Sequence, residues 1–414
     1  MTTLSSQISF LNELYGIEKE KPKGFVLRDY QEEAVQKGVE HLLSGKKPGI
    51  IVAPTGAGKS LYIANIAKRL NGNVLILSPS KELLEQNYNK LLSYNTGIDI
   101  GIYSASFNSR EIKPITFATI GSIYKKVELF KKFEYIIVDE CHIVSNSPDM
   151  MYNQFLTSLK NKKLIGMTAS PWRLNTTSWG SCLKFLTRTR PRIFHDIIHY
   201  TQIKDLLNQG FLADTKYYQV NNGFDTSKLV VNSTKSDYTD ESMKKYFKYI
   251  NFDGSVLDVS KRLMNAGRKN LLVFTKFVDE ARLLAADLGD MAAIVHGEMP
   301  MKERTRILND FKDPNGKIKI VANCGVLILG FDFPELETVL QARPSKSATY
   351  YYQTIGRVLR PHVLKSSAWV VDIVQNYSRF GKVEDFWLTK SKIDNQWCFV
   401  NRATGEQITN KYFK

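Results

Sequence analysis

A glycine-rich stretch, "IIVAPTGAGKS" at residues 50–60, has residue types that could bind a phosphate. Its small residues would let backbone N–H groups point at an anion, and the helix predicted to follow adds a favourable dipole. Lys59 could reach the β- and γ-phosphates of a nucleotide, and Ser60 could bind Mg²⁺. The context predicts a nucleoside triphosphate site rather than a plain turn, although Ala53 stands where the usual signature has Gly. The residues expected around the phosphates are Pro54, Thr55, Gly56, Ala57, Gly58, Lys59 and Ser60.

Two adjacent acids end the apolar run of "YIIVDECH", residues 135–142. Ligand crevices of parallel sheets open at the carboxyl ends of strands. Asp139 would hold Mg²⁺, directly or through water, and Glu140 would orient and activate an attacking water. Many loops begin with acids, so the pair indicates a nucleotide site only because it follows a phosphate loop in the chain. Cys141 and His142 lack companions for a metal site, and we expect His142 to hydrogen-bond across a domain cleft.

A third element is "YYYQTIGRVLRP", residues 350–361. Gln353, Arg357 and Arg360 recur at roughly helical spacing, which places them near one helix face. Arginines that reach a γ-phosphate from a separate domain stabilise the charge of the transition state. The alternative is a solvated basic face, but Gly356 is a poor helix residue and indicates close approach of another group.

The chain has 414 residues, 43% hydrophobic and 24% charged, which allows a sizeable core and two or three domains. Its formal net charge of +16 favours an anionic polymer, with nucleic acid as the first candidate, although some proteins are simply basic. Cys141, Cys182, Cys324 and Cys398 form no CxxC pair, so we expect no zinc, no disulfide framework and an intracellular, cytoplasmic location. We find no signal peptide and no apolar run long enough for a membrane span.

Two regions alternate short apolar runs with helix-like stretches, which predicts parallel sheets covered on both faces. In the first region the runs are "PGIIVA" (48–53), "VLIL" (74–77), "ITF" (115–117), "YIIV" (135–138) and "LIGM" (164–167). In the second they are "LLVF" (271–274), "AAIV" (292–295), "IKIVA" (318–322), "TVL" (338–340) and "WVV" (369–371). Residues 196–255 are polar and predict a connector with some helix. The end, "NQWCFVNRATGEQITNKYFK", predicts a β-hairpin that turns near "NRATGE".

Several motifs occur in a set order: "LRDYQEEAV", "APTGAGKS", "SPSKELLEQ", "DECH", "MTASPWR", "VFT", "GFD" and "QTIGRVLR". Together they resemble the DExH-box helicases of superfamily two, over roughly residues 25–375. The resemblance implies an α/β fold of two tandem RecA-like domains with parallel sheets and the ATP site in the cleft between them. We expect a lead segment (1–22), an ATP-binding domain (23–195), a connector (196–255), a second RecA-like domain (256–380) and a small C-terminal hairpin extension (381–414).

The resemblance implies roles for residues of the nucleotide site. Gln31, with Arg28 nearby, corresponds to the glutamine that reads adenine, whose edge suits an amide. Asp332 in "GFD" matches the residue that approaches the ribose. Arg360 is the expected arginine finger, and Arg357 is its partner at the phosphates.

Other positions match motifs that contact nucleic acid or that couple ATP hydrolysis to this contact. Thr168 and Ser170 match the motif that links the ATP state to strand contact. Lys81, Thr119 and Ser122 match positions that touch the nucleic-acid backbone, although Lys81 and Thr119 could equally be ordinary surface residues.

Within the superfamily, "VDECH", "MTASPWRL" and "VANCGVLILGFDFPELETVLQARPS" resemble RadD-type and phage UvsW-type DNA helicases. RadD-type proteins carry a cysteine-rich zinc segment near the C-terminus, where this chain has Cys398 alone. We also expect the chain to lack the large N-terminal extension of UvsW-type enzymes. Trp387 and Trp397 of the C-terminal hairpin could stack on bases or pack the hairpin onto the second domain.

These features predict an ATP- and Mg²⁺-dependent helicase or translocase that acts on nucleic acid, with DNA favoured over RNA. An RNA helicase and a double-stranded DNA translocase that separates no strands are the alternatives. A binding module without catalysis is disfavoured by the intact set of Lys59, Asp139, Glu140 and Arg360. An ATPase that acts on proteins is disfavoured by the basic charge and the coupling motifs.

Overall fold

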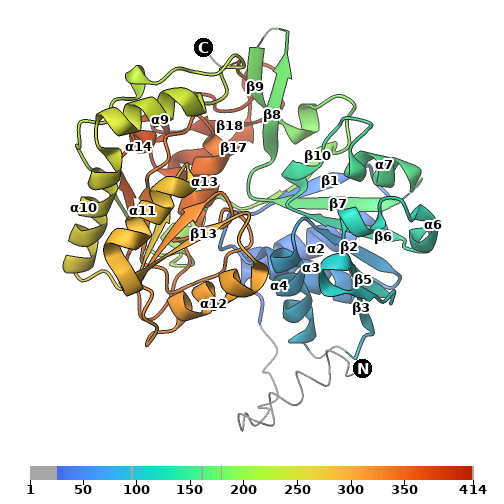
Figure 1. Ribbon diagram of the computed structural model, residues 1–414. Helices are drawn as coiled ribbons and strands as arrows, with labels where there is room; N and C mark the ends of the chain where they lie inside the picture. Colours follow the sequence, from blue (N-terminus) through green and yellow to red (C-terminus); the bar gives the residue numbers. More distant parts are fainter. Residues whose placement is uncertain (1–25, 95–96, 160–161, 179, 413–414) are drawn as a thin grey trace.

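Two open β-sheets, each with its own helices, lie side by side in the computed structural model (Figure 1). The structure describes residues 26–94, 97–159, 162–178 and 180–412. The predicted lead segment, residues 1–22, lies outside the described residues. No helix within them is long and apolar enough to cross a membrane.

The first sheet contains the phosphate loop, and its neighbouring strands are parallel except for the last pair, β3 with β4. From edge to edge its strands are β10 (Asp196–Tyr200), β1 (Gly49–Val52), β7 (Lys163–Thr168), β6 (Tyr135–Asp139), β2 (Val74–Ser78), β5 (Ile115–Thr119), β3 (Ile100–Ser104) and β4 (Ser109–Arg110). Strands β1, β2 and β6 are buried at every position, as expected for strands covered on both faces.

The helices of the first half precede or connect these strands. They are α2 (Asp29–Leu43), α3 (Lys59–Arg69), α4 (Lys81–Leu92), α5 (Ile120–Ile123), α6 (Val127–Phe130) and α7 (Met151–Ser158), with the short 3₁₀ turns η1 (Ala105–Phe107), η2 (Cys141–Ile143) and η3 (Leu186–Arg188). An antiparallel ribbon, β8 (Trp172–Thr177) and β9 (Gly180–Phe185), follows β7 and extends beyond the sheet (Figure 1).

The second sheet is parallel throughout. Its strands lie in the order β11 (Thr215–Gln219), β16 (Ala368–Asp372), β15 (Thr338–Gln341), β12 (Leu271–Phe274), β14 (Ile320–Cys324) and β13 (Ala292–His296). The helices of this half are α8 (Ile203–Asn208), α9 (Asp240–Tyr249), α10 (Phe252–Asn265), α11 (Val278–Leu288), α12 (Met301–Lys312), α13 (Ala348–Gly356) and α14 (Asn376–Phe380), with η4 (Thr226–Lys228), η5 (Gly289–Met291) and η6 (Val383–Asp385).

The predicted connector, residues 196–255, is divided differently in the structure. Its first residues form β10, which pairs with β1 from Gly49↔Asp196 onward and so extends the first sheet. Residues 215–219 form β11, which pairs with β16 and is an edge of the second sheet. Both strands are edge strands with several exposed positions, so neither shows the continuous apolar run that marked the central strands.

The C-terminal extension forms a hairpin of β17 (Phe386–Lys390) and β18 (Trp397–Asn401). The turn predicted near "NRATGE" follows β18, where Asn401 N donates to the Glu406 carbonyl and Val400 pairs with Gln407. Contrary to the packing on the second domain that we considered, Trp397 contacts the first sheet. Its Nε1 donates to Asp196 Oδ1 at 2.8 Å, and its ring lies edge-on to Tyr200.

The hairpin also joins the two halves through a buried amide. Gln202 Nε2 donates to the Leu388 carbonyl at 2.8 Å, and Leu388 N donates to Gln202 Oε1 at 3.2 Å. On its other side Phe386 stacks on Tyr352 of α13. The same short hairpin therefore packs against both halves of the protein.

Replacing Gln202 with alanine should lower the free energy of unfolding by about 2 kcal/mol, because it leaves two buried backbone groups of Leu388 without partners. Urea denaturation followed by circular dichroism measures the change. Gln209→Ala, which truncates an exposed glutamine of the same segment, should change it by less than about 0.5 kcal/mol. Equal effects of the two substitutions would show that the Gln202 contact contributes nothing.

Candidate nucleotide-binding site

The phosphate loop leaves the carboxyl end of β1 and enters α3 at Gly58. Gly58 has a φ of 93°, a left-handed conformation that glycine adopts without steric cost. A Cβ at this position would lie 2.7 Å from Gln31 Nε2, so no larger residue fits beside that amide. Ala53 is fully buried at the end of β1, and its N–H donates to the Thr168 carbonyl. The methyl group that departs from the usual signature is therefore core packing, away from the phosphates.

Gln31 of α2 is buried and holds the phosphate loop. Its Nε2 donates to the Ala57 carbonyl at 3.0 Å, and its Oε1 accepts from Arg28 N at 3.0 Å. Tyr30 donates to the same Ala57 carbonyl at 3.1 Å. The Arg28 guanidinium stacks over the Phe211 ring, 4.2 Å from its centroid. The residues expected to read adenine therefore line the approach to the loop and fix its backbone.

The two acids lie at the carboxyl end of β6, facing the loop lysine. Lys59 Nζ is 3.3 Å from Glu140 Oε1, and Asn87 Nδ2 donates to Asp139 Oδ2 at 2.8 Å. Burial and the neighbouring charge of Glu140 raise the pKa of Asp139 to about 6. Burial would also raise the pKa of Glu140, but Lys59 and His142 together bring it below its ordinary value. Glu140 is therefore ionised at neutral pH, as a group that polarises a water must be.

A chain of polar side chains runs from Glu140 across the cleft. Thr168 Oγ1 lies 2.8 Å from His142 Nδ1 and donates to Glu140 Oε2 at 3.3 Å. Gln353 of the second domain donates to Ser170 Oγ at 3.2 Å and lies 3.4 Å from His142 Nε2. The residues predicted to couple ATP hydrolysis to nucleic-acid contact are thus in one hydrogen-bond network that joins the domains.

Two arginines enter the cleft from the second domain. Arg357 donates to the Phe331 carbonyl at 2.8 Å, and Arg360 pairs with Asp332. Burial lowers the pKa of both guanidinium groups to about 10, so both remain cationic at neutral pH. The shared helix face that we predicted is wrong for Arg360, because α13 ends at Gly356 with Arg357 as its cap. Arg360 precedes Pro361, which disfavours helical backbone at that position.

Gly356 explains how closely the two domains approach. A Cβ at this glycine would lie 2.6 Å from Cβ and 2.7 Å from Oγ1 of Thr55, in the phosphate loop. The end of α13 therefore rests directly on the loop. The close approach that the sequence indicated is contact between the two halves of the site.

A cavity of about 190 Å³ opens between the loop, the acids and the arginines. Of the predicted residues, those that line it are Pro54, Thr55, Gly56, Gly58, Lys59, Ser60, Asp139, Glu140, Asp332, Arg357 and Arg360. Helix α4 adds Leu83, Gln86 and Lys90, which sequence reasoning missed. Gln86 Nε2 donates to Ser60 Oγ at 3.2 Å. The sequence contains one sign that α4 faces the site: Asn87 is an amide on the apolar helix face that also carries Leu84 and Leu91, and the structure buries it.

The residues predicted to touch nucleic acid lie away from this cavity. Lys81 begins α4, with its amino group over the Phe107 ring. Thr119 ends β5, and its hydroxyl bonds to Ser104 and Ser122. Ser122 also accepts from Ala105 N at 2.9 Å. All three predicted side chains lie at or just beyond the carboxyl ends of strands of the first sheet, and their roles stay predictions.

The donor set suits a magnesium nucleotide. Ser60 and Asp139 present oxygen ligands, and Lys59 and two arginines surround the same space. The Nε of Arg357 is buried and has no partner among the described residues, so a donor remains for a further acceptor. The glycines of the loop leave room for an anion to approach the backbone.

Two regions of the chain match known families. Residues 24–173 match the family described as "Type III restriction enzyme, res subunit", and residues 254–362 match "Helicase conserved C-terminal domain". These two matches, with relatives named as ATP-dependent helicases, fit a helicase of superfamily two. The finer likeness to RadD-type and UvsW-type enzymes stays a prediction.

Relatives of this helicase include curated proteins and solved structures. It is 28% identical to "DNA 3'-5' helicase XPB" of Kineococcus radiotolerans, over 88% of this chain and 62% of that protein. It is 25% identical to "Putative ATP-dependent helicase IRC3" of Saccharomyces cerevisiae, over 84% of this chain and 51% of that protein. The helicase thus spans between half and two-thirds of these relatives' lengths.

Among solved structures, the helicase is similar to a fragment of a putative HsdR subunit of a type I restriction enzyme from Vibrio vulnificus. The TM-score is 0.65 at 21% identity, over 99% of this chain and 76% of that one. The predicted fold of two tandem RecA-like domains is confirmed.

Gly356→Ala should lower ATP turnover at least about tenfold, because the added methyl group pushes α13, and with it the arginines, away from Thr55. Steady-state ATPase assays measure the loss, with a thermal melt as the check on folding. Gly121→Ala provides the control, since a Cβ there meets nothing within 4 Å. Normal turnover in Gly356→Ala would mean that contact between α13 and the loop is dispensable.

Proposed function

We propose that this helicase hydrolyses ATP in the cleft between its two domains and uses the energy to move along DNA, with or without separating the strands. The observation that carries the proposal is the facing pair of Lys59 from the first domain and Arg360 from the second, both lining one cavity. A γ-phosphate bound there would contact both domains, so its loss on hydrolysis would release one domain from the other.

Each residue of the site has a distinct part in this mechanism. The phosphate loop and Lys59 bind the β- and γ-phosphates, and Glu140 orients the attacking water and takes its proton. Arg360 and Arg357 stabilise the charge that develops on the transferred phosphoryl group. Ser60 and Asp139 would hold Mg²⁺, whose charge offsets that of the phosphates when it is bound. Gln31 would face the adenine, and Asp332 the ribose.

The network of His142, Thr168, Ser170 and Gln353 would report the state of the nucleotide to the second domain. It reaches from Glu140 to α13 through hydrogen bonds of 2.8 to 3.4 Å. A change at the γ-phosphate that displaces Glu140 would alter the bonds that hold α13. Domain movement would follow, because α13 is part of the second domain.

DNA is the proposed polymer because relatives are named DNA helicases and the chain is strongly basic. Contacts to the phosphate backbone would make binding tolerant of sequence and sensitive to salt. Lys81, Thr119 and Ser122 are the contacts proposed in the first domain. We propose that the domain limits predicted above hold outside the connector, whose strands β10 and β11 belong to the first and second sheet respectively.

Lys59→Ala should abolish ATP turnover while leaving DNA binding largely intact, because Lys59 lies in the nucleotide cavity beside Glu140 and not among the residues proposed to contact DNA. A coupled ATPase assay and an anisotropy assay with labelled DNA measure the two properties. Lys68→Ala, an exposed lysine of the same helix, is the matched control. The assignment of the site would be wrong if Lys59→Ala hydrolysed ATP at the normal rate.

Arg360→Ala should reduce kcat by on the order of 10³-fold with little change in nucleotide affinity, as expected for an arginine finger. Steady-state kinetics combined with nucleotide titration separate the two effects. Arg282→Ala removes an exposed arginine of α11 and should leave kcat unchanged. A change confined to KM would contradict the finger role.

Single-stranded DNA, duplex DNA, branched DNA and RNA should differ in how strongly they stimulate ATP hydrolysis, and DNA should stimulate it more than RNA. A strand-displacement assay on the same substrates decides between unwinding and translocation alone. Stronger stimulation by RNA would overturn the DNA assignment. Stimulation by duplex DNA without displacement would favour the translocase.

A further inference from the structure

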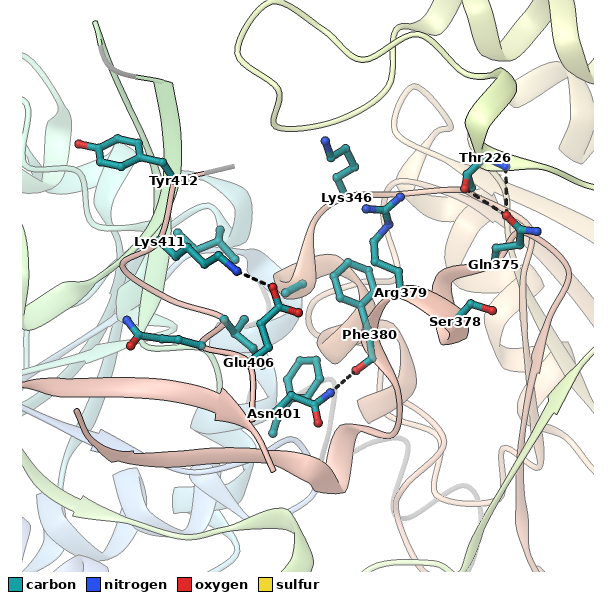
Figure 2. A pocket seen from close by; sticks show the side chains of 15 residues that line it. Thr226, Lys346, Gln375, Ser378, Arg379, Phe380, Asn401, Glu406, Lys411 and Tyr412 are labelled. Atoms are coloured by element: carbon teal, nitrogen blue, oxygen red, sulfur yellow. Dashed lines mark hydrogen bonds and ion pairs between the residues drawn. The ribbon is translucent and has the colours of Figure 1, made fainter. Parts of the chain in front are cut away.

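A second and larger cavity, of about 560 Å³, lies outside the nucleotide site (Figure 2). Several parts of the chain form it, including Leu183 of β9. Lys346 follows β15 and Arg379 belongs to α14, both in the second domain, while Thr226 comes from the connector. Lys411 comes from the C-terminal tail, which pairs with β9 of the first domain through the bridge Cys182↔Tyr412. The cavity is therefore shared between the two halves of the motor.

The charges that line this cavity are mainly positive. Lys346 and Arg379 lie side by side, and Lys411 lies across the space from them (Figure 2). Glu406 is the carboxylate in the lining, and it is paired with Lys411 at 2.7 Å. Within the described part of the chain, no ion pair involves the Lys346 amino group or the Arg379 guanidinium.

Two like charges held together cost free energy unless an anion lies near both. Burial and the charge of Arg379 lower the pKa of Lys346, so its ammonium group lacks full compensation. Lys235 adds further positive charge nearby, and Asp237 offsets part of it. A bound anion would remove this cost.

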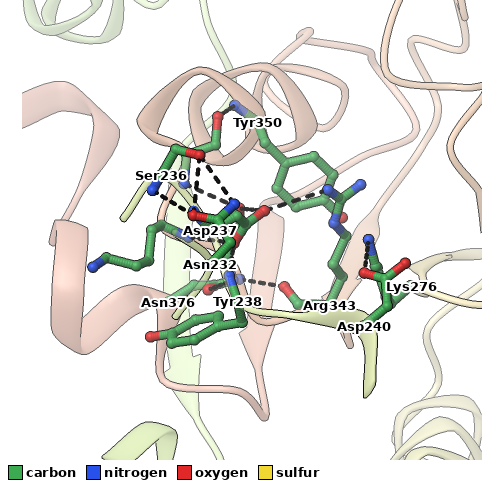
Figure 3. A network of polar contacts seen from close by, with 12 residues as sticks. Asn232, Ser236, Asp237, Tyr238, Asp240, Lys276, Arg343, Tyr350 and Asn376 are labelled. Atoms are coloured by element: carbon green, nitrogen blue, oxygen red, sulfur yellow. Dashed lines mark hydrogen bonds and ion pairs between the residues drawn. The ribbon is translucent and has the colours of Figure 1, made fainter. Parts of the chain in front are cut away.

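The connector fixes the position of Lys346. Asp237 Oδ1 accepts from Lys346 N at 3.0 Å, and Asp237 Oδ2 accepts from Ser345 Oγ at 3.3 Å. Arg343 approaches the same carboxylate at 3.6 Å (Figure 3). Asp237 thus organises the backbone of the loop, while the side chain of Lys346 extends into the cavity. Arg379 is held by a 2.5 Å hydrogen bond from its Nη2 to the Tyr238 hydroxyl.

We propose that this cavity binds a backbone phosphate of the single strand on which the motor acts, between Lys346 and Arg379. The inference rests on the proposed function and adds a contact to it. A chain ligand fits better than a free nucleotide because Ser378, Arg379, Glu406 and Lys411 are exposed along the rim, which leaves the cavity open to a polymer. Phe380 offers a half-buried ring in the lining against which a base could stack.

Helix α13 links this cavity to the nucleotide site. It begins at Ala348, which lines the cavity, and ends at Gly356 on the phosphate loop. Its length of nine residues spans about 13 Å. Between these ends Gln353 bonds to Ser170. A phosphate held by Lys346 would therefore act on the arginines through one rigid element.

The test is the binding of a labelled thymidine 30-mer across a salt series, without ATP, to the wild type and to the double variant Lys346→Ala/Arg379→Ala. The variant should bind on the order of tenfold more weakly. The slope of log K against log [salt] should fall by about 1 for each phosphate that the variant no longer neutralises. Lys346→Arg, which keeps the charge, should bind nearly as well as the wild type.

The matched control is Lys261→Ala/Arg262→Ala, which removes two exposed cations from the outer helix α10. It should keep the affinity and the salt slope of the wild type, and thermal melts should show that all variants fold. Equal binding by the two double variants would overturn the proposal. A change in the affinity for ATP or inorganic phosphate, with DNA binding intact, would overturn it in favour of a free phosphate ligand.

The proposed function can fail separately from this site. If the wild type neither binds the oligonucleotide nor gains ATPase activity from any nucleic acid, the motor assignment fails. If the wild type does both and the cavity variant behaves as the control, only the cavity assignment fails.

Discussion

The structure depends on bringing several cations and carboxylates into one buried cleft so that charges of opposite sign face each other. Lys59 faces Glu140, and Arg360 faces Asp332, so each domain contributes both signs of charge to the contact. Burial lowers the pKa of both arginines, because a buried guanidinium loses hydration. A ligand with several negative charges fits this arrangement, because it can replace the carboxylates as the partner of the cations.

The close packing of the domains follows from the same constraint. Charges separated by water are screened, so the arginines can act only if α13 touches the phosphate loop. Gly356 permits that contact, with no side chain between the helix and Thr55. The hairpin of β17 and β18 also stabilises this contact. Phe386 of the hairpin packs on α13. Gln202 and Asp196 bond the hairpin to the first half.

Movement of one domain against the other would also have to change further contacts between them. Arg304 of α12 approaches Glu82 of α4 at 3.9 Å, and Trp172 of the β8–β9 ribbon donates to Thr349 of α13 at 2.8 Å. The second cavity lies where α13 begins, between the connector and the tail that pairs with β9. Its shape therefore depends on the same domain arrangement as the nucleotide cleft, and α13 is the element common to both.

The sequence by itself determined the central strands, the phosphate loop, the acid pair and the partner arginines. These are local features: buried strands require continuous apolar runs, and the loop requires glycine, lysine and serine in fixed succession. It missed β4, β10 and β11, because short or half-exposed edge strands carry no such run. It also missed β3, whose sequence "IGIYS" is interrupted by Gly101 and ends in serine. Only the tertiary structure decided that Arg360 lies beyond the end of α13 and that Trp397 packs on the first domain. It alone placed Lys346 beside Arg379 and Gln86 beside Ser60, because these pairs are distant in the chain and meet only when the strands have taken their order in the sheets.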